Sequence, residues 1–183
     1  MSGGPSRLLA LLPPADVAEQ VQAWRKQHGV QDAAATPHIT VKARSGLGAG
    51  QDWVPAAQAV AAATAPVTLT LGAAPRLFPR GRALYLPVTS PEAVALHLAL
   101  LDALSPARRF GYEGPAMQPH LSLALGRRAV DLPRLLAAAE AELAELAGLS
   151  WTARCLALLR KPGPGGAYAV QECWPLGTAA EQA

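Results

Sequence analysis

The chain has 183 residues, of which 51% are hydrophobic and 16% are charged, and its formal net charge is +3. This length fits one domain or two small lobes, and the apolar content excludes a mainly disordered chain. No uninterrupted apolar run reaches the roughly 18 residues of a membrane span, and the N-terminus lacks the pattern of a secretory leader. We therefore expect a single cytoplasmic domain over residues 1–183, without membrane attachment and with a basic balance that suits a polyanionic partner.

Hydrophobic patterns predict alternating strands and helices through the first half of the chain. A short apolar run stops at Pro13, and Val17, Val21 and Trp24 then recur at helical spacing until Gly29 ends the helix. In chain order we expect a strand at 7–12, a helix at 15–28, a strand at 38–43, a helix at 52–64, a strand at 66–71 and a short edge strand within 76–80.

The same order of elements begins again at residue 82. Ser90 and Pro91 are residue types that favour an N-cap and a first helical position, so a helix should start there. We expect a strand at 82–88, a helix at 92–104, a strand at 120–125, a helix at 131–147, and strands at 151–159 and 167–174 joined by a turn at 162–166. Across this hairpin Cys155 and Cys173 could face each other, and we expect them as free thiols.

Two stretches of the chain, residues 7–72 and 82–161, share one order of strand, helix, strand, helix and strand. Their first strands begin 75 residues apart, and His38 and His120, which begin the next strands, are 82 residues apart. Two such related halves can place equivalent residues face to face across a cleft with pseudo-twofold symmetry, which is a natural position for a site.

Two segments share the pattern proline, histidine, aliphatic, hydroxyl, aliphatic, and they occupy equivalent places in the two halves. Because alternate side chains of a strand point to one face, His38 and Thr40 should project together, and so should His120 and Ser122. The aliphatic residues between them should point into the core. Each strand then presents one imidazole and one hydroxyl on a polar face.

Two imidazoles and two hydroxyls are what transesterification or hydrolysis of a phosphodiester requires. A neutral imidazole accepts a proton from the attacking group, a charged imidazole donates one to the departing oxygen, and the hydroxyls hold the phosphoryl oxygens. Imidazole is the side chain that titrates near neutral pH, so we expect a bell-shaped pH dependence. The set needs neither a metal nor another cofactor.

The paired motifs, in strands of a duplicated framework, resemble the two-histidine phosphoesterase superfamily, and within it the bacterial 2'-5' RNA ligase group, whose members also act as RNA 2',3'-cyclic phosphodiesterases. The resemblance implies an α+β fold of two pseudo-symmetric lobes of antiparallel sheet, with flanking helices around a central groove. It implies His38 and His120 as catalytic residues with Thr40 and Ser122 binding phosphate, and no metal. It further implies hydrolysis of a 2',3'-cyclic phosphate to a 2'-phosphate, with 2'-5' RNA ligation as a related reverse activity.

Two cations complete the expected phosphate site. Lys42 should share the face of His38 by strand alternation, although a solvated surface lysine is an equal alternative. Close bacterial relatives often carry an arginine a few residues after the second histidine, whereas here Leu125 and Gly126 precede Arg127. We expect Arg127 to bind phosphate. We also expect the protein to be a monomer whose partners are RNA ends or oligonucleotides.

Other interpretations of the same residues remain open. Two histidines can bind a metal, but no carboxylate or cysteine adjoins either motif to complete a zinc site. Ser122 lacks the G-x-S-x-G context of a serine nucleophile. The chain could also be an RNA-binding module without catalysis, or a phosphodiesterase for a small cyclic nucleotide or a 2'-5' oligonucleotide.

The remaining histidines and the aromatic residues have less specific patterns. His28 and His97 lie in predicted helices without a hydroxyl partner, so we interpret them as structural or surface residues. Five aromatic residues can stack on bases at the groove or anchor the core and loops: Trp53, Phe78, Tyr85, Phe110 and Tyr112.

Overall fold

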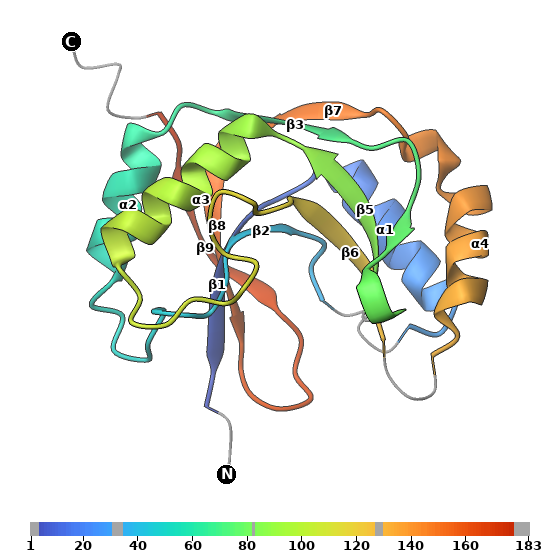
Figure 1. Ribbon diagram of the computed structural model, residues 1–183, viewed down its shortest axis with the longest axis horizontal. Helices are drawn as coiled ribbons and strands as arrows, with labels where there is room; N and C mark the ends of the chain where they lie inside the picture. The colour runs from blue at the N-terminus through green and yellow to red at the C-terminus, as the bar shows by residue number, and fades with distance from the viewer. Residues whose placement is uncertain (1–3, 31–34, 82, 127–129, 178–183) are drawn as a thin grey trace.

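The computed structural model describes residues 4–30, 35–81, 83–126 and 130–177 (Figure 1). The helices within these ranges are α1 (Ala15–Gln27), α2 (Val54–Ala63), α3 (Pro91–Leu104) and α4 (Leu132–Glu142). The strands are β1 (Ser6–Leu11), β2 (Ile39–Lys42), β3 (Val67–Leu71), β4 (Arg76–Leu77), β5 (Ala83–Thr89), β6 (His120–Leu125), β7 (Ser150–Ala153), β8 (Cys155–Lys161) and β9 (Ala169–Pro175). Short 3-10 turns follow β4 at Pro79–Gly81 and α4 at Ala144–Leu146.

The strands form one antiparallel sheet in the order β7-β3-β5-β6-β2-β1-β8-β9, with β4 paired to β5. The sheet curls into a half-barrel, with α2 and α3 on one side of the molecule and α1 and α4 on the other (Figure 1). The expected α+β class, with antiparallel sheet and flanking helices, is confirmed. The predicted N-cap is also confirmed, because the Ser90 hydroxyl accepts a hydrogen bond from the Ala93 amide at 3.1 Å.

Each half contributes a helix to the other half. Helix α3, from the second half, packs on β2, and α1, from the first half, packs on β6. Strands β2 and β6 meet at the centre of the sheet, where Ile39 pairs with Leu121. These two residues are 82 positions apart and therefore equivalent in the predicted repeat, so a pseudo-twofold axis through the seam would pass between them.

The strand pairs of the two halves have the same register. In the first half Ala10 pairs with Thr40, and in the second Tyr85 pairs with Ser122, again at offsets of 75 and 82 residues. In both strand pairs the register then shifts by one residue immediately after the motif, because Val41 and Leu123 have no partner on the neighbouring strand. Such a bulge reverses which face the following side chains occupy.

The C-terminal strands differ from the expectation in two respects. The predicted strand at 151–159 is interrupted at Arg154, so that β7 pairs with β3 and β8 pairs with β1. The chain passes there from one end of the sheet to the other. In the hairpin, Cys173 lies opposite Ala157, and Cys155 lies opposite Pro175, so the thiols are diagonal neighbours; both are free.

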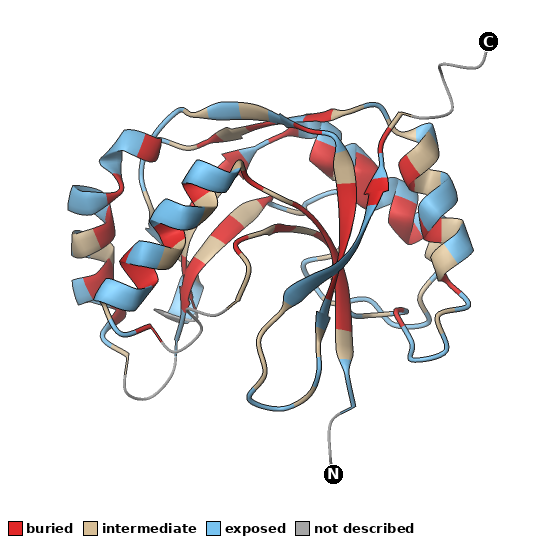
Figure 2. Ribbon diagram, turned by 180° about the vertical axis from the view of Figure 1, so that it is seen from behind, coloured by how far each residue is buried: buried red, intermediate tan, exposed pale blue. Residues whose placement is uncertain are grey.

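The main core lies between the sheet and the helices, where buried residues of all four helices face inward (Figure 2). Trp53 belongs to this core and donates from Nε1 to the Gly48 carbonyl at 3.0 Å, so it anchors its loop. A second, small cluster consists of Leu8, Ala10, Ala157 and Leu159, with Tyr168 packed against it. Among the described helices, none has the length and apolarity needed to cross a membrane.

Candidate active site

The two motifs lie side by side at the seam between β2 and β6. Ile39 and Leu121 pair there and are fully buried, so the residues on either side of them point to the opposite face. Continued by one residue in each direction, this register places His38 across from Ser122 and Thr40 across from the histidine of the second motif. All four motif side chains are half-buried, so they can meet both protein and solvent.

Backbone carbonyl groups orient both motif imidazoles in the same way. His38 donates from Nδ1 to the Thr36 carbonyl at 2.7 Å, and His120 donates from Nδ1 to the Gln118 carbonyl at 2.9 Å. A carbonyl oxygen can only accept a hydrogen bond, so Nδ1 carries a proton whether the ring is neutral or charged. Nε2 is therefore the nitrogen of each ring that is left to gain or lose a proton.

Aromatic rings lie against both imidazoles. Phe78 and Tyr85 stack on each other with centroids 4.1 Å apart, and the His120 ring meets them edge-on at 4.9 and 5.5 Å. Tyr168 meets His38 edge-on at 6.2 Å. These contacts restrict the rotation of the imidazoles and exclude water from one side of each ring.

Tyr168 reaches the site from the loop between β8 and β9. Its hydroxyl shares a hydrogen bond of 2.6 Å with the Ser6 hydroxyl, and its carbonyl accepts from the Thr36 amide at 3.0 Å. The Thr36 carbonyl is the acceptor of His38, so one residue links the β8–β9 loop to the imidazole. The C-terminal hairpin thus helps to fix the first motif.

Both imidazoles are shifted toward their neutral forms. Burial lowers the pKa of His38, and Arg25 and His120 lower it further, while the hydrogen bond to Thr36 partly opposes the change. Burial also lowers the pKa of His120, against the opposing hydrogen bond to Gln118. Such perturbation of two adjacent groups is typical of catalytic acid and base pairs.

The carbonyl groups freed by the two bulges accept hydrogen bonds from the helix of the opposite half. Arg25 of α1 donates to the carbonyls of Ser122 at 2.6 Å and Leu123 at 3.1 Å. His97 of α3 donates from Nδ1 to the Val41 carbonyl at 2.6 Å. These contacts hold the strand backbone directly behind each motif, because an unpaired buried carbonyl would be costly.

Arg25 was not selected by the sequence analysis, although its position carried a signal. It follows Val17 by eight residues and Val21 by four, so it lies on the buried face of α1, where a charged residue needs a specific partner. Besides its two bonds to β6, it donates to the Ala35 carbonyl at 2.7 Å. The interpretation of His97 as structural agrees with its burial and its bond to β2.

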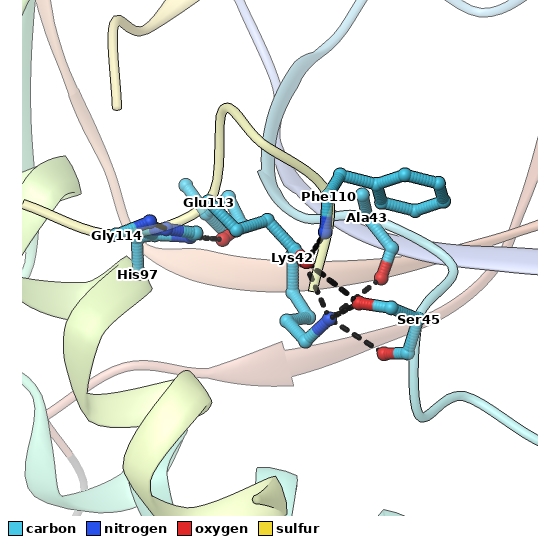
Figure 3. Close-up of polar contacts among 8 residues, drawn as sticks. Lys42, Ala43, Ser45, His97, Phe110, Glu113 and Gly114 are labelled. Atoms are coloured by element: carbon cyan, nitrogen blue, oxygen red, sulfur yellow. Dashed lines mark hydrogen bonds and ion pairs between the residues drawn. The ribbon is translucent and has the colours of Figure 1, made fainter. Parts of the chain in front are cut away.

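Lys42 corrects one expectation, because it does not share the face of His38. The bulge at Val41 places Lys42 opposite Leu9, on the face covered by helices. Its side chain has no exposed surface, and Nζ bonds Glu113 at 2.8 Å and the Ser45 carbonyl at 2.6 Å (Figure 3). Its ammonium group is thus occupied within the fold, away from the face of His38, which indicates a structural role for Lys42.

Other expected groups have different outcomes. Arg127 lies outside the described residues, so its role in binding phosphate stays a prediction. Within the described part of the chain, no three His, Cys, Asp or Glu side chains converge in a way that could hold a metal ion. A cavity of about 380 Å³ opens beside Trp53 and Leu104, and none of the four motif residues lines it.

Comparisons with known proteins identify the family of the chain and folds similar to it. The sequence matches the family described as the 2'-5' RNA ligase superfamily over residues 13–165. The fold is similar to that of the Thermus thermophilus protein TT0787, with a TM-score of 0.62, 20% identity, and coverage of 94% of this chain and 98% of that one.

It is also similar to Escherichia coli LigT. The LigT crystal structure with NADP+ superimposes with a TM-score of 0.61 and 19% identity, covering 97% of this chain and 99% of LigT. The structure with 3'-AMP gives a TM-score of 0.60 and 20% identity, covering 94% and 98%. Among curated protein sequences, none matches this chain significantly. The family match extends over most of the chain and includes both histidine motifs, and the chain therefore belongs to the 2'-5' RNA ligase superfamily.

Proposed function

We propose that the protein is a metal-independent RNA 2',3'-cyclic phosphodiesterase that leaves a 2'-phosphate end. The observation that supports it most strongly is the matched orientation of the two imidazoles. Each Nδ1 is committed to a backbone carbonyl, so each ring offers Nε2 as its single exchanging nitrogen. Two such nitrogens flanked by two hydroxyls suit in-line displacement at phosphorus.

In this mechanism one Nε2 removes a proton from water as the water oxygen attacks phosphorus. The bond between phosphorus and O3' breaks, and the second imidazolium donates its proton to O3'. Thr40 and Ser122 donate hydrogen bonds to the nonbridging phosphoryl oxygens, whose charge increases in the transition state. When the 5'-hydroxyl of another RNA replaces water, the same displacement gives a 2'-5' linkage.

The environments of the two rings favour His38 as the base and His120 as the acid. A base must be neutral before the reaction, and the Arg25 cation adds to the burial that disfavours the charged form of His38. His120 meets the rings of Phe78 and Tyr85 in edge-on contacts. Burial disfavours its charged form too, so the incoming phosphate anion must supply the field that keeps its proton.

The test is cleavage of a short RNA ending in a 2',3'-cyclic phosphate, with EDTA present throughout. The wild type should release a 2'-phosphate end, and His38→Ala and His120→Ala should each lose about two to four powers of ten in kcat, because each removes one proton-transfer group. His28→Gln is the matched histidine control, because His28 caps the C-terminus of α1 and bonds Glu142 outside the motifs, and it should retain activity.

Each alternative gives a different result in the same assay. Loss of turnover on adding EDTA would refute metal independence. Tight RNA binding without turnover on any cyclic-phosphate end would identify a binding module. A 3'-phosphate product would show that the bond to O2' breaks, which contradicts the proposed placement of the acid.

A further inference from the structure

Three planar side chains stack beside the first motif, outside the four motif residues. Arg44 follows β2, and Phe110 and Tyr112 lie in the loop between α3 and β6. The Phe110 and Tyr112 rings are nearly parallel, at an angle of 7° with centroids 5.3 Å apart. The Arg44 guanidinium carbon lies 5.5 Å from the Phe110 centroid. We refer to these three residues as the Arg-Phe-Tyr stack.

The stack is open to solvent and carries positive charge. Tyr112 is 62% exposed, an unusual position for a large aromatic side chain. Arg44 is exposed too, as are Arg108 and Arg109 in the same loop. The one carboxylate of that loop, Glu113, is buried and paired, so it does not offset these cations at the surface.

The loop that carries the stack is held firmly on both sides of Tyr112. The Phe110 amide donates to Glu113 Oε2 at 2.7 Å, and the Gly114 amide donates to His97 Nε2 at 2.9 Å (Figure 3). His97 is itself bound to β2, behind the first motif. Because the backbone is already ordered, a ligand that binds the stack pays little entropy to fix it.

Tyr168 lies against His38 of the first motif. Its ring meets His38 at 6.2 Å, as described above. Its phenol also acts on Tyr112: burial and the charge of Glu113 raise the pKa of Tyr112, Tyr168 raises it further, and Arg44 lowers it. Tyr168 and the loop of Tyr112 both connect to the first motif, Tyr168 through His38 and the loop through its bonds to His97 and Lys42.

We propose that the Arg-Phe-Tyr stack binds a nucleobase of single-stranded RNA, next to the nucleotide that reacts at the two histidines. An exposed ring with arginines around it matches a base with its adjoining phosphates, because bases stack on aromatic faces and guanidinium groups bind phosphate. The inference rests on the proposed function and deepens it, since it assigns an oligonucleotide as the substrate in preference to a mononucleotide.

The first experiment compares two substrates of the same chemistry. One is a nucleoside 2',3'-cyclic phosphate, and the other is a tetranucleotide ending in the same cyclic phosphate. Stacking of one base contributes roughly tenfold or more to binding. The ratio of kcat/KM for the tetranucleotide to that for the mononucleotide should therefore fall about tenfold in Tyr112→Ala and recover in Tyr112→Phe. Arg134→Ala, an exposed arginine on α4, is the matched charge control and should keep the ratio.

The second experiment does not require turnover. An RNA that carries 2-aminopurine as its penultimate base and ends in a 2'-phosphate is titrated with each variant. Stacking on Tyr112 should quench the fluorescence in the wild type and in Tyr112→Phe, and Tyr112→Ala should lose the quenching. Tyr112 is largely exposed, so its truncation leaves the core intact.

The outcomes separate this inference from the proposed function. Turnover with an unchanged substrate ratio in Tyr112→Ala, or quenching that does not depend on Tyr112, would overturn the base site and leave the phosphodiesterase standing. Absence of turnover on both substrates, with quenching that depends on Tyr112, would refute the phosphodiesterase and support the base site.

Discussion

The buried ion pair of Lys42 and Glu113 allows a quantitative prediction about the loop that carries Phe110 and Tyr112. Lys42 Nζ lies 2.8 Å from Glu113 Oε1, and the two side chains are 0% and 1% exposed. At this distance the Coulomb attraction is about 6 kcal/mol for an effective dielectric constant of about 20. Desolvation costs several kcal/mol for each ion, so the pair as a whole contributes little net stability.

Removing one partner should lower the free energy of unfolding by far more than the pair as a whole contributes to it. Glu113→Gln leaves Lys42 as an uncompensated buried cation. The cost has an upper limit of about 5 kcal/mol, because at pH 7 the lysine can lose its proton from an ordinary pKa of 10.5. Lys42→Met strands the carboxylate, and we expect a loss of about 3–5 kcal/mol. The double variant should cost at least about 2 kcal/mol less than the sum of the single variants.

Urea unfolding monitored by circular dichroism measures these differences. Lys26→Met, an exposed lysine on α1, is the control and should change the free energy of unfolding by less than about 0.5 kcal/mol. Single variants that cost less than about 1 kcal/mol, or a double variant equal to their sum, would show that the pair is hydrated and would refute the reasoning.

The pH dependence of the same variants provides an independent check. Burial alone would raise the pKa of Glu113, but hydrogen bonds from Lys42, from the Phe110 amide and from the Ser45 hydroxyl, together with the lysine charge, hold that pKa below its ordinary value of 4.5. A depressed carboxyl pKa contributes stability above pH 4.5 that is lost as the pH falls through the folded-state pKa. Glu113→Gln should lack this part of the acid destabilisation.

Three further predictions concern groups whose environment the structure defines. The pKa values of His38 and His120 are both lowered from 6.5, so kcat/KM should peak on the acid side of pH 6.5, which a pH–rate profile checks. The free energy of unfolding should fall as the pH drops below 6.5, because the unfolded chain binds more protons there. Urea titrations at several pH values check this fall. Arg25→Met should cost about 3 kcal/mol or more in urea unfolding, since it leaves three backbone carbonyls without their donor. Burial, with Cys173 beside it, raises the pKa of Cys155 to about 12, so native-state alkylation at pH 8 followed by mass spectrometry should find Cys155 almost unmodified.

Strand periodicity predicted the motif face correctly for a physical reason. The alternation of side chains in β2 and β6 places Ile39 and Leu121 in the core, and this follows from the pleat alone. The orientation of the imidazoles was not predictable in the same way. It depends on the carbonyl groups of Thr36 and Gln118, and therefore on the backbone path before each proline.

The same periodicity failed one residue beyond the first motif. A bulge at Val41 turned Lys42 to the helical face, and no local residue type indicates such a bulge. It depends on pairing with β1 and on the hydrogen bond from His97, a residue 56 positions away. Glu113 likewise showed no sequence pattern, because its partners come from a distant strand. Beyond such a bulge, contacts between residues distant in the sequence determine on which face of the strand a side chain lies, and local sequence patterns do not reveal them.

The two motifs are equivalent, but the residues around their two imidazoles differ. Two histidines need different surroundings if one is to act as the base and the other as the acid. Behind the second motif the supporting residue is a cation, Arg25, and behind the first it is His97, whose bonds to a carbonyl and to an amide fix it as a neutral ring. Arg25 also acts electrostatically on His38, and two stacked aromatic rings contact His120 where a single, more distant ring, Tyr168, meets His38. A symmetric environment would give both imidazoles the same pKa and no preference for acid or base. In the proposed mechanism, this asymmetry of the supporting residues favours proton removal at His38 and proton donation at His120.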